Sequence, residues 1–344
     1  MGLKCCKTDH NSSDGSDDEE LIRFFMVGMG GAGKSTVIRQ LMKLCYDCPN
    51  LYKLYDSEWN EKSNIHSEGD LRKWKITIQQ NILEAFCNTI KQSRLFGFEF
   101  NEEQSGIVAE IESLCDDVRT LHLRRSEWSP LFNEQLGKKL SKLIASNQDP
   151  IKCTLMRCQE FAAEYRLPDG VDNFITEEKI TYYAKQDTVP DEDDIVHARD
   201  PTSGLDYYHF LVHKMRIQIH DMGGQMIERT KILEYLSHWL SDSKPNYRNF
   251  ILYVVSIADY NVKHPNRTQY TLLDESEPVS IETLRKAIAN KFAKEISNNA
   301  VKRRSPVFHK FTCAVDSKMM ENLFGTIRSE IILKTIIDQD WAFP

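Results

Sequence analysis

The sequence has no long apolar run and no recognisable leader. None of its apolar stretches reaches about 18 residues, the length that a helix needs to cross the core of a bilayer. The opening residues Met-Gly-Leu-Lys-Cys-Cys also lack the apolar centre of a secretory signal. We therefore expect a globular chain without membrane spans, and its 344 residues are enough for two compact domains.

Basic clusters and internal repeats are also missing. The chain carries 44 Lys and Arg against 51 Asp and Glu, which gives a net charge of −7. No basic stripe marks a surface for a polyanion. We expect no nucleic-acid partner.

The nine cysteines lack the spacing of a disulfide framework. Cys45 and Cys48 form a lone C-x-x-C pair, and a zinc site would need a second pair at a suitable distance. In a chain without a leader, this use of cysteine predicts reduced thiols in a cytosolic compartment. Structural or incidental cysteines are favoured over a metal site.

The strongest positive signal is a glycine-rich loop. Residues 28–35 (GMGGAGKS) satisfy the pattern G-x-x-x-x-G-K-[ST] between an apolar run at 21–27 and a helical pattern at 36–45. In such a loop backbone N–H groups surround an anion, and the helix start adds its positive dipole end. Lys34 is expected near the terminal phosphates, and the Ser35 hydroxyl can ligate Mg²⁺. The pattern predicts a nucleoside triphosphate without naming its base.

Apolar periodicity divides the chain into an α/β part and a helical part. Helical spacing recurs at 74–96, 107–123, 131–144 and 151–165. After residue 190, strand and helix patterns alternate at 207–212, 215–220, 250–256, 281–296, 307–313 and 319–337. We expect the first two of these to pair as a hairpin and 250–256 to be the most buried strand. The pattern predicts an α/β nucleotide-binding domain interrupted by a helical insert.

Two loop segments carry side chains suited to a bound triphosphate. Residues 194–204 (DIVHARDPTSG) include Arg199 and Thr202, and residues 217–225 (IQIHDMGGQ) place Asp221 at the end of a strand. A carboxylate there can hold a Mg²⁺-bound water, a glycine amide can contact a terminal phosphate, and a glutamine can orient an attacking water. Taken alone, the first segment is more simply an ordinary loop and the second could equally be a strand-end turn.

Taken in order, these segments resemble the α subunits of heterotrimeric G proteins. The resemblance runs from Leu21 to the C-terminus, and residues 311–314 (FTCA) are similar to the family's Thr-Cys-Ala loop beside the guanine base. It implies a Ras-like P-loop GTPase domain with a parallel sheet at 21–47 and 191–344. It also implies an inserted all-helical domain at 48–190 and GTP-hydrolysing activity.

The resemblance implies a site for GTP or GDP and Mg²⁺. Arg199 would stabilise charge on the transferred phosphoryl group, and Gln225 would orient the water. The metal would be bound by Ser35 and Thr202, and by Asp221 through water. The nucleotide would be contacted by Gly28, Gly30, Gly31, Ala32, Gly33, Lys34, Ser35, Thr36, Val196, His197, Ala198, Arg199, Asp221, Met222, Gly223, Gly224, Gln225 and Ala314.

The chain departs from the family at the base-recognition motif. An Asn-Lys-x-Asp motif should follow the strand at 250–256 and its helix, but near 262–280 that motif and one strand are missing. Each hydrogen bond lost to such a carboxylate removes about 1.5–3 kcal/mol, which erodes the preference for guanine. Gly31 and Ala32 replace the family's Glu and Ser, so a salt bridge to Arg199 is forfeited. Met226 and Ile232 replace an arginine and a tryptophan.

The N-terminus carries residues typical of a lipid anchor. Gly2 is the position that N-myristoyl transfer requires, and Cys5 and Cys6 are candidates for palmitoylation. One acyl chain anchors a protein only marginally, so the second would be needed. We expect an acylated, disordered tail at 1–20, at the cytoplasmic face of the plasma membrane and partly cytosolic. An unmodified tail is the alternative.

The family resemblance implies a GTP-hydrolysing switch that couples a seven-helix receptor to an effector and binds a βγ dimer. The alternative is a G-α-like decoy that occupies the receptor or βγ subunits without efficient turnover, which the missing motif favours. A P-loop ATPase of another family would also explain the missing motif, but not the pair of loop segments.

Overall fold

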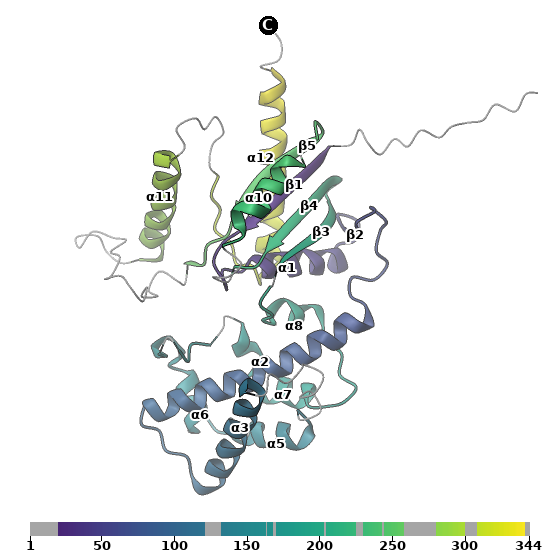
Figure 1. Cartoon of the computed structure of the whole chain (residues 1–344). Helices are drawn as coiled ribbons and strands as arrows, with labels where there is room; N and C mark the ends of the chain where they lie inside the picture. Colours follow the sequence, from purple (N-terminus) through teal and green to yellow (C-terminus); the bar gives the residue numbers. More distant parts are fainter. Residues whose placement is uncertain are drawn as a thin grey trace, which may run out of the picture.

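Within the described residues, the fold contains a five-stranded sheet flanked by helices, and a separate group of helices (Figure 1). The computed structural model describes residues 20–120, 132–162, 164–167, 170–202, 204–224, 230–242, 244–257, 280–299 and 308–340. The two groups have distinct apolar cores, because one set of buried side chains comes from helices between residues 78 and 198 and the other from the sheet and its helices.

The sheet has the strand order β2-β3-β4-β1-β5. Its strands are β1 (Leu21–Val27), β2 (Tyr52–Tyr55), β3 (Leu205–Val212), β4 (Met215–Met222) and β5 (Tyr247–Tyr253). β1 is parallel to both β4 and β5, whereas β3 is antiparallel to β2 and β4. The predicted hairpin is therefore confirmed. The central β1 is buried along its whole length, as its apolar run predicts for a strand covered on both faces.

Helices cover the two faces of the sheet. The helices of this part are α1 (Lys34–Asp47), α10 (Ile232–Ser241), α11 (Ile281–Asn299) and α12 (Ser317–Asp340). Side chains of α1 and α12 pack on one face, and those of α10 pack on the other around Trp239 and Phe25. None of the helices in the described parts of the chain is both long and apolar enough to cross a membrane.

The separate helical group is organised around α2 (Glu68–Leu95). This helix starts at a capping box in which Ser67 and Asp70 satisfy each other's backbone N–H groups. The other elements are α3 (Glu102–Thr120), α5 (Glu134–Lys142), α6 (Pro150–Leu155), η2 (Cys158–Glu160), η3 (Val171–Phe174), α7 (Glu177–Tyr183) and α8 (Glu192–His197). Apolar residues of α2, spaced at three and four, supply much of its core, including Ile78, Ile82, Phe86 and Ile90.

Three predictions about these elements are wrong. The block that begins at residue 48 is not all-helical, because β2 pairs with β3 and belongs to the sheet. The helix predicted at 151–165 ends at Leu155 and is followed only by the short η2. Residues 308–313 form no strand although 307–313 was predicted as one, and residue 307 lies outside the described residues.

The prediction that 250–256 is the most buried strand is also wrong. β5 lies at one edge of the described sheet, where Ile251 and Tyr253 are 59% and 53% exposed. Phe250 and Leu252, on the other face, pack against the core beneath the sheet. Apolar composition predicted the strand correctly but could not show that its second face lacks full cover.

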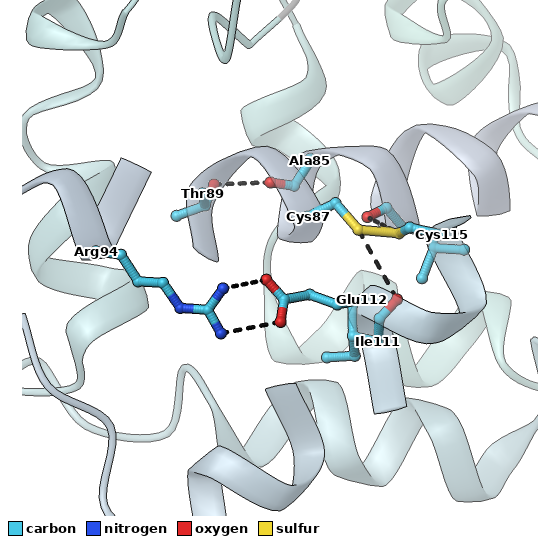
Figure 2. Close-up of a disulfide and its surroundings, with 8 residues drawn as sticks. Ala85, Cys87, Thr89, Arg94, Ile111, Glu112 and Cys115 are labelled. Atoms are coloured by element: carbon cyan, nitrogen blue, oxygen red, sulfur yellow. Dashed lines mark hydrogen bonds and ion pairs between the residues drawn. A yellow bond between two sulfur atoms is a disulfide. The ribbon is translucent and has the colours of Figure 1, made fainter. Parts of the chain in front are cut away.

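A disulfide joins Cys87 on α2 to Cys115 on α3 inside the helical core (Figure 2). The prediction of reduced thiols is therefore wrong for these two residues, while five described cysteines are free: Cys45, Cys48, Cys153, Cys158 and Cys313. An ion pair of Arg94 with Glu112, whose Nη2–Oε2 distance is 2.9 Å, joins the same two helices. The disulfide could not be predicted from the sequence, because 28 residues separate the two cysteines and only the packing of α2 on α3 brings them together.

Removing this disulfide is expected to destabilise the helical group. For a cross-link across 28 residues, the loop-closure entropy is worth about 3–4 kcal/mol of unfolding free energy. Urea denaturation of a variant with Cys87→Ser and Cys115→Ser should show this loss, whereas Cys158→Ser, at an exposed free cysteine, should not. An unchanged midpoint in the double variant would contradict the assignment.

A buried polar network crosses the sheet beneath α10. Arg23 Nε and His220 Nε2 donate to Gln218 Oε1 at 3.0 and 2.9 Å, and Gln218 Nε2 donates to His209 Nε2 at 3.0 Å. The last bond requires a neutral His209. Burial, with the charge of Arg23 adding to it, lowers the pKa of His220 to about 3, and burial also lowers the pKa of His209.

Acid pH is expected to weaken the fold through this network. Since the folded pKa of His220 is about 3 and the ordinary value is about 6.5, the unfolded chain takes up the proton first. The unfolding free energy therefore falls as the pH drops from about 6.5 towards 3. Between pH 7 and 5, protonation of this histidine in the unfolded chain lowers the unfolding free energy by about 2 kcal/mol. Urea titrations over this range should show a shallower pH dependence for His220→Gln than for the parent chain; equal slopes would count against the neutral network.

Candidate functional site

The glycine-rich loop makes a tight turn between β1 and α1. A Cβ atom added at Gly28 would lie 2.3 Å from the backbone oxygen of Val254, so only glycine fits there. Gly31 and Gly33 adopt φ values of 80° and 94°, in the left-handed region that glycine favours. Ala32 N donates to Met29 O at 3.2 Å and closes the turn.

Lys34 and Thr36 begin α1 directly after this turn. Lys34 is buried, and its Nζ donates to Gly28 O and Met29 O, both at 3.0 Å. The ammonium group is thus held within the loop whose amides are suited to phosphates. Gly30 is exposed on the same turn, which leaves the loop accessible from solvent.

Three oxygen-bearing side chains meet beside the loop. Ser35 Oγ lies 2.5 Å from Thr202 Oγ1 and donates to Asp221 Oδ2 at 2.7 Å. Asp221 is buried at the end of β4, and its other oxygen, Oδ1, has no hydrogen-bond partner. Two hydroxyls and an orphaned carboxylate oxygen form a donor set that fits a hard cation such as Mg²⁺. No cluster of three His, Cys, Asp or Glu side chains suited to a metal exists in the described residues.

The electrostatics of this cluster are set by burial. Burial raises the pKa of Asp221, whereas the hydrogen bond from Ser35 and the charge of Lys34 oppose the rise. A cation bound beside the carboxylate would compete with Ser35 for its oxygens.

The residues after β4 press against the glycine-rich loop. Gly223 N donates to Gly204 O at 3.0 Å, which joins the two predicted loop segments. A Cβ atom added at Gly224 would lie 2.4 Å from Lys34 Nζ and 2.6 Å from Gly30 N. The backbone of Gly224 therefore lies directly against the loop. Met222 is buried in the core under α10.

Arg199 reaches the glycine-rich loop from the first loop segment, residues 194–204. A Cβ atom added at Gly31 would lie 3.3 Å from Arg199 Nη1, so the guanidinium occupies the space that this glycine leaves. Val196 and Ala198 are buried beside it, and His197 Nδ1 donates to Asp193 O at 2.8 Å. The structure thus brings Arg199 to the loop, as the predicted site requires.

The remaining predicted residues divide into two groups. Ala314 is half-buried and packs against the core shared by the sheet, α1 and α12. Gln225 and the lipidation candidates Gly2, Cys5 and Cys6 lie outside the described residues.

Two residues of the site were not predicted. Arg39 on α1 donates to Ala198 O and, at 3.2 Å, to Ser35 O. Asn81 on α2 exchanges two hydrogen bonds with the backbone of Arg199. Both are polar residues buried on helices. Other polar residues stand beside them on α1 and α2, so no local sequence signal indicates these two.

The loop, the hydroxyl–carboxylate cluster and the two segments that meet over them define a P-loop nucleotide-binding protein of the α/β class. The chain belongs to the G-protein alpha subunit family, whose model matches residues 7–277. The family membership that the resemblance implied is thereby confirmed, while residues 311–314 lie beyond the match.

Individual relatives agree. The chain is 27% identical to guanine nucleotide-binding protein subunit alpha-1 of Trichomonas vaginalis over 71% of this chain and 50% of that protein. It is 23% identical to guanine nucleotide-binding protein alpha-3 subunit of Ustilago hordei over 70% and 56% of the two chains. It is 24% identical to guanine nucleotide-binding protein G(o) subunit alpha of Planorbella trivolvis over 74% and 61%. The match therefore spans 50–61% of the length of these relatives.

Proposed function

We propose that the protein binds a guanine nucleoside triphosphate together with Mg²⁺ and hydrolyses it as a molecular switch. The observation that carries the proposal is the convergence of Ser35, Thr202 and Asp221 beside the glycine-rich loop. Three segments far apart in sequence place hard oxygen ligands next to amides suited to phosphates. Membership of the G-protein alpha subunit family supports a guanine nucleotide and GTPase activity.

The binding residues neutralise the triphosphate. Amides of the loop and the Lys34 ammonium surround the phosphate oxygens. Ser35, Thr202 and Asp221, whose side-chain oxygens meet beside the loop, would hold the metal. When bound, Mg²⁺ supplies positive charge that offsets the charge on the phosphate oxygens.

The catalytic residues act on the terminal phosphoryl group. Arg199, whose guanidinium lies over Gly31, stabilises the charge that develops during transfer. Gln225 orients the attacking water. The N–H of Gly224 contacts the γ-phosphate, so its position depends on whether that group is present.

The proposal extends to the partners of the switch. A seven-helix G protein-coupled receptor, a βγ dimer and a downstream effector would act with this chain, as implied for members of its family. Gly2, Cys5 and Cys6 would carry myristate and palmitate and hold the protein to the inner leaflet of the plasma membrane.

A decoy function is the second candidate. The sequence has no Asn-Lys-x-Asp motif, and β5 lies at the edge of the described sheet. A chain without that base contact could occupy a receptor or a βγ dimer without cycling nucleotide efficiently.

Nucleotide titrations distinguish the two candidates. The purified chain is titrated with fluorescent GTP, GDP and ATP analogues in Mg²⁺, and phosphate release from bound GTP is then followed in a single turnover. Guanine-preferring binding followed by release is the expected result. Tight binding of βγ dimer or receptor without nucleotide uptake would instead establish the decoy, and a preference for ATP would overturn the guanine assignment.

A further inference from the structure

One side chain of the helical group, Asn81, forms two hydrogen bonds with the backbone of Arg199. Asn81 Nδ2 donates to Arg199 O at 3.0 Å, and Arg199 N donates to Asn81 Oδ1 at 2.7 Å. The carboxamide thus satisfies both peptide groups of this single residue. Asn81 is itself only 7% exposed, and both hydrogen bonds are partly buried.

The residues on either side of Arg199 are held as well. Arg39, from α1, donates to Ala198 O and lies over the ring of Trp74 on α2, 5.3 Å from its centroid. Lys73, also on α2, forms an ion pair with Asp200 at 3.3 Å. Burial lowers the pKa of Arg39 to about 10, so its guanidinium stays charged at neutral pH.

These contacts fix the main chain while the side chain reaches the loop. Residues 198–200 are each bonded to α1 or α2, and the Arg199 guanidinium lies over Gly31. A mobile main chain would carry the base of the Arg199 side chain away from the loop, and ordering it in each reaction cycle would cost backbone entropy. Anchoring its backbone instead places the guanidinium near its working position in advance.

Packing alone does not explain an asparagine at position 81. On α2 its sequence neighbours include Ile78, Ile82 and Ala85 of the apolar core as well as the buried polar residues Thr77 and Gln79. A buried amide is costly unless it is hydrogen-bonded, and asparagine is a poorer helix former than leucine. An apolar residue would suit the helix better, whereas only a side chain with both a donor and an acceptor can pair with one whole residue of backbone.

We propose that Asn81 is a positioning residue for Arg199 in GTP hydrolysis, holding the arginine's backbone so that its guanidinium stays over the phosphate loop. The inference rests on the proposed function of Arg199 as the catalytic arginine.

The test compares single-turnover hydrolysis in four chains: parent, Asn81→Ala, Arg199→Ala and the double variant. Asn81→Ala should slow hydrolysis about 10- to 100-fold, the size of effect that a small misplacement produces. Its affinity for a non-hydrolysable GTP analogue should stay within about twofold. Once Arg199 is absent, the Asn81 substitution should add less than about twofold, because the two residues act as a unit.

Two further variants keep the test decisive. Asn81→Asp has the size of asparagine and keeps the acceptor but loses the donor to Arg199 O, so it should also slow hydrolysis even if Asn81→Ala fails to fold. Asn88→Ala changes the same residue type at a half-buried position two turns along α2 and should hydrolyse GTP at the parent rate.

The results distinguish the positioning role of Asn81 from the catalytic role of Arg199. If Arg199→Ala hydrolyses GTP at the parent rate, the proposed catalytic role of Arg199 is wrong. If Arg199→Ala is slow while both Asn81 variants match the parent, the positioning role alone is overturned. An Asn81 effect that persists undiminished in the Arg199→Ala background would show a merely structural role and would also overturn it.

Discussion

Replacing Arg199 with alanine is expected to slow GTP hydrolysis by about 10³-fold or more while leaving nucleotide binding largely intact. The figure is the lower end of the range known for arginines that serve this family and its relatives, and is taken from them and not from the distances in this structure. The physical reason is that the guanidinium over Gly31 stabilises charge that is larger in the transition state than in bound GTP. Single-turnover phosphate release measures the effect.

Two companion variants sharpen this prediction. Arg199→Lys keeps the charge but not the planar fork of donors, so it should recover only part of the lost rate. Arg72→Ala removes an exposed arginine of α2 whose contacts, an ion pair at 3.8 Å and a hydrogen bond at 3.3 Å, are both with Glu68. This variant should hydrolyse GTP at the parent rate. If Arg199→Ala hydrolyses GTP at the parent rate, Arg199 is not the catalytic arginine.

Substituting Gly224 with alanine is expected to abolish the response of the chain to the γ-phosphate. The added Cβ would lie 2.4 Å from Lys34 Nζ and 2.6 Å from both Gly30 N and Met29 C, and the last two are backbone atoms that cannot swing aside. The segment after β4 must therefore move away from the loop, and its N–H loses the phosphate. Affinity for a non-hydrolysable GTP analogue should fall about tenfold or more, the cost of one lost hydrogen bond to a charged group.

Affinity for GDP serves as the internal reference for Gly224→Ala. GDP lacks the γ-phosphate, so its affinity should change by less than about threefold, well under the energy of one charged hydrogen bond. Gly106→Ala is a matched control, because this helical glycine of α3 has open space where a Cβ would stand. Equal losses for GDP and the GTP analogue would mean that Gly224 supports the whole loop and does not report on the terminal phosphate.

The glycine-rich loop could be predicted from the sequence because its chemistry is local. The residues from Gly28 to Ser35 are consecutive, and the strand and helix on either side orient them. Thr202 and Asp221 could be placed only by resemblance to a family. Ser35 donates a hydrogen bond to Asp221 and shares one with Thr202, so the three side chains do converge.

The contacts that support Arg199 could not be predicted in the same way. Asn81 is 118 residues away from it and Arg39 is 159 residues from Ala198, so no local pattern links them. They become visible only once α1 and α2 pack beside the segment after α8. The Cys87–Cys115 disulfide escaped for the same reason.

The strands beyond β1 show the limit of composition. The run at 250–256 is as apolar as a central strand, yet β5 lies at the edge of the described sheet with Ile251 exposed. Residues 308–313 have strand-like composition and form irregular backbone. A strand needs a partner, and the identity of that partner depends on distant parts of the chain.

The central claim is that amides of the glycine-rich loop hold a triphosphate while oxygens of Ser35, Thr202 and Asp221 hold its Mg²⁺. Calorimetric titration of the purified chain with a non-hydrolysable GTP analogue, at rising Mg²⁺ concentrations, measures this coupling directly. We expect binding that Mg²⁺ strengthens about tenfold or more, in keeping with a coupling of about 1–3 kcal/mol between two ligands. Binding that is absent, or that is equally tight with and without Mg²⁺, would contradict it.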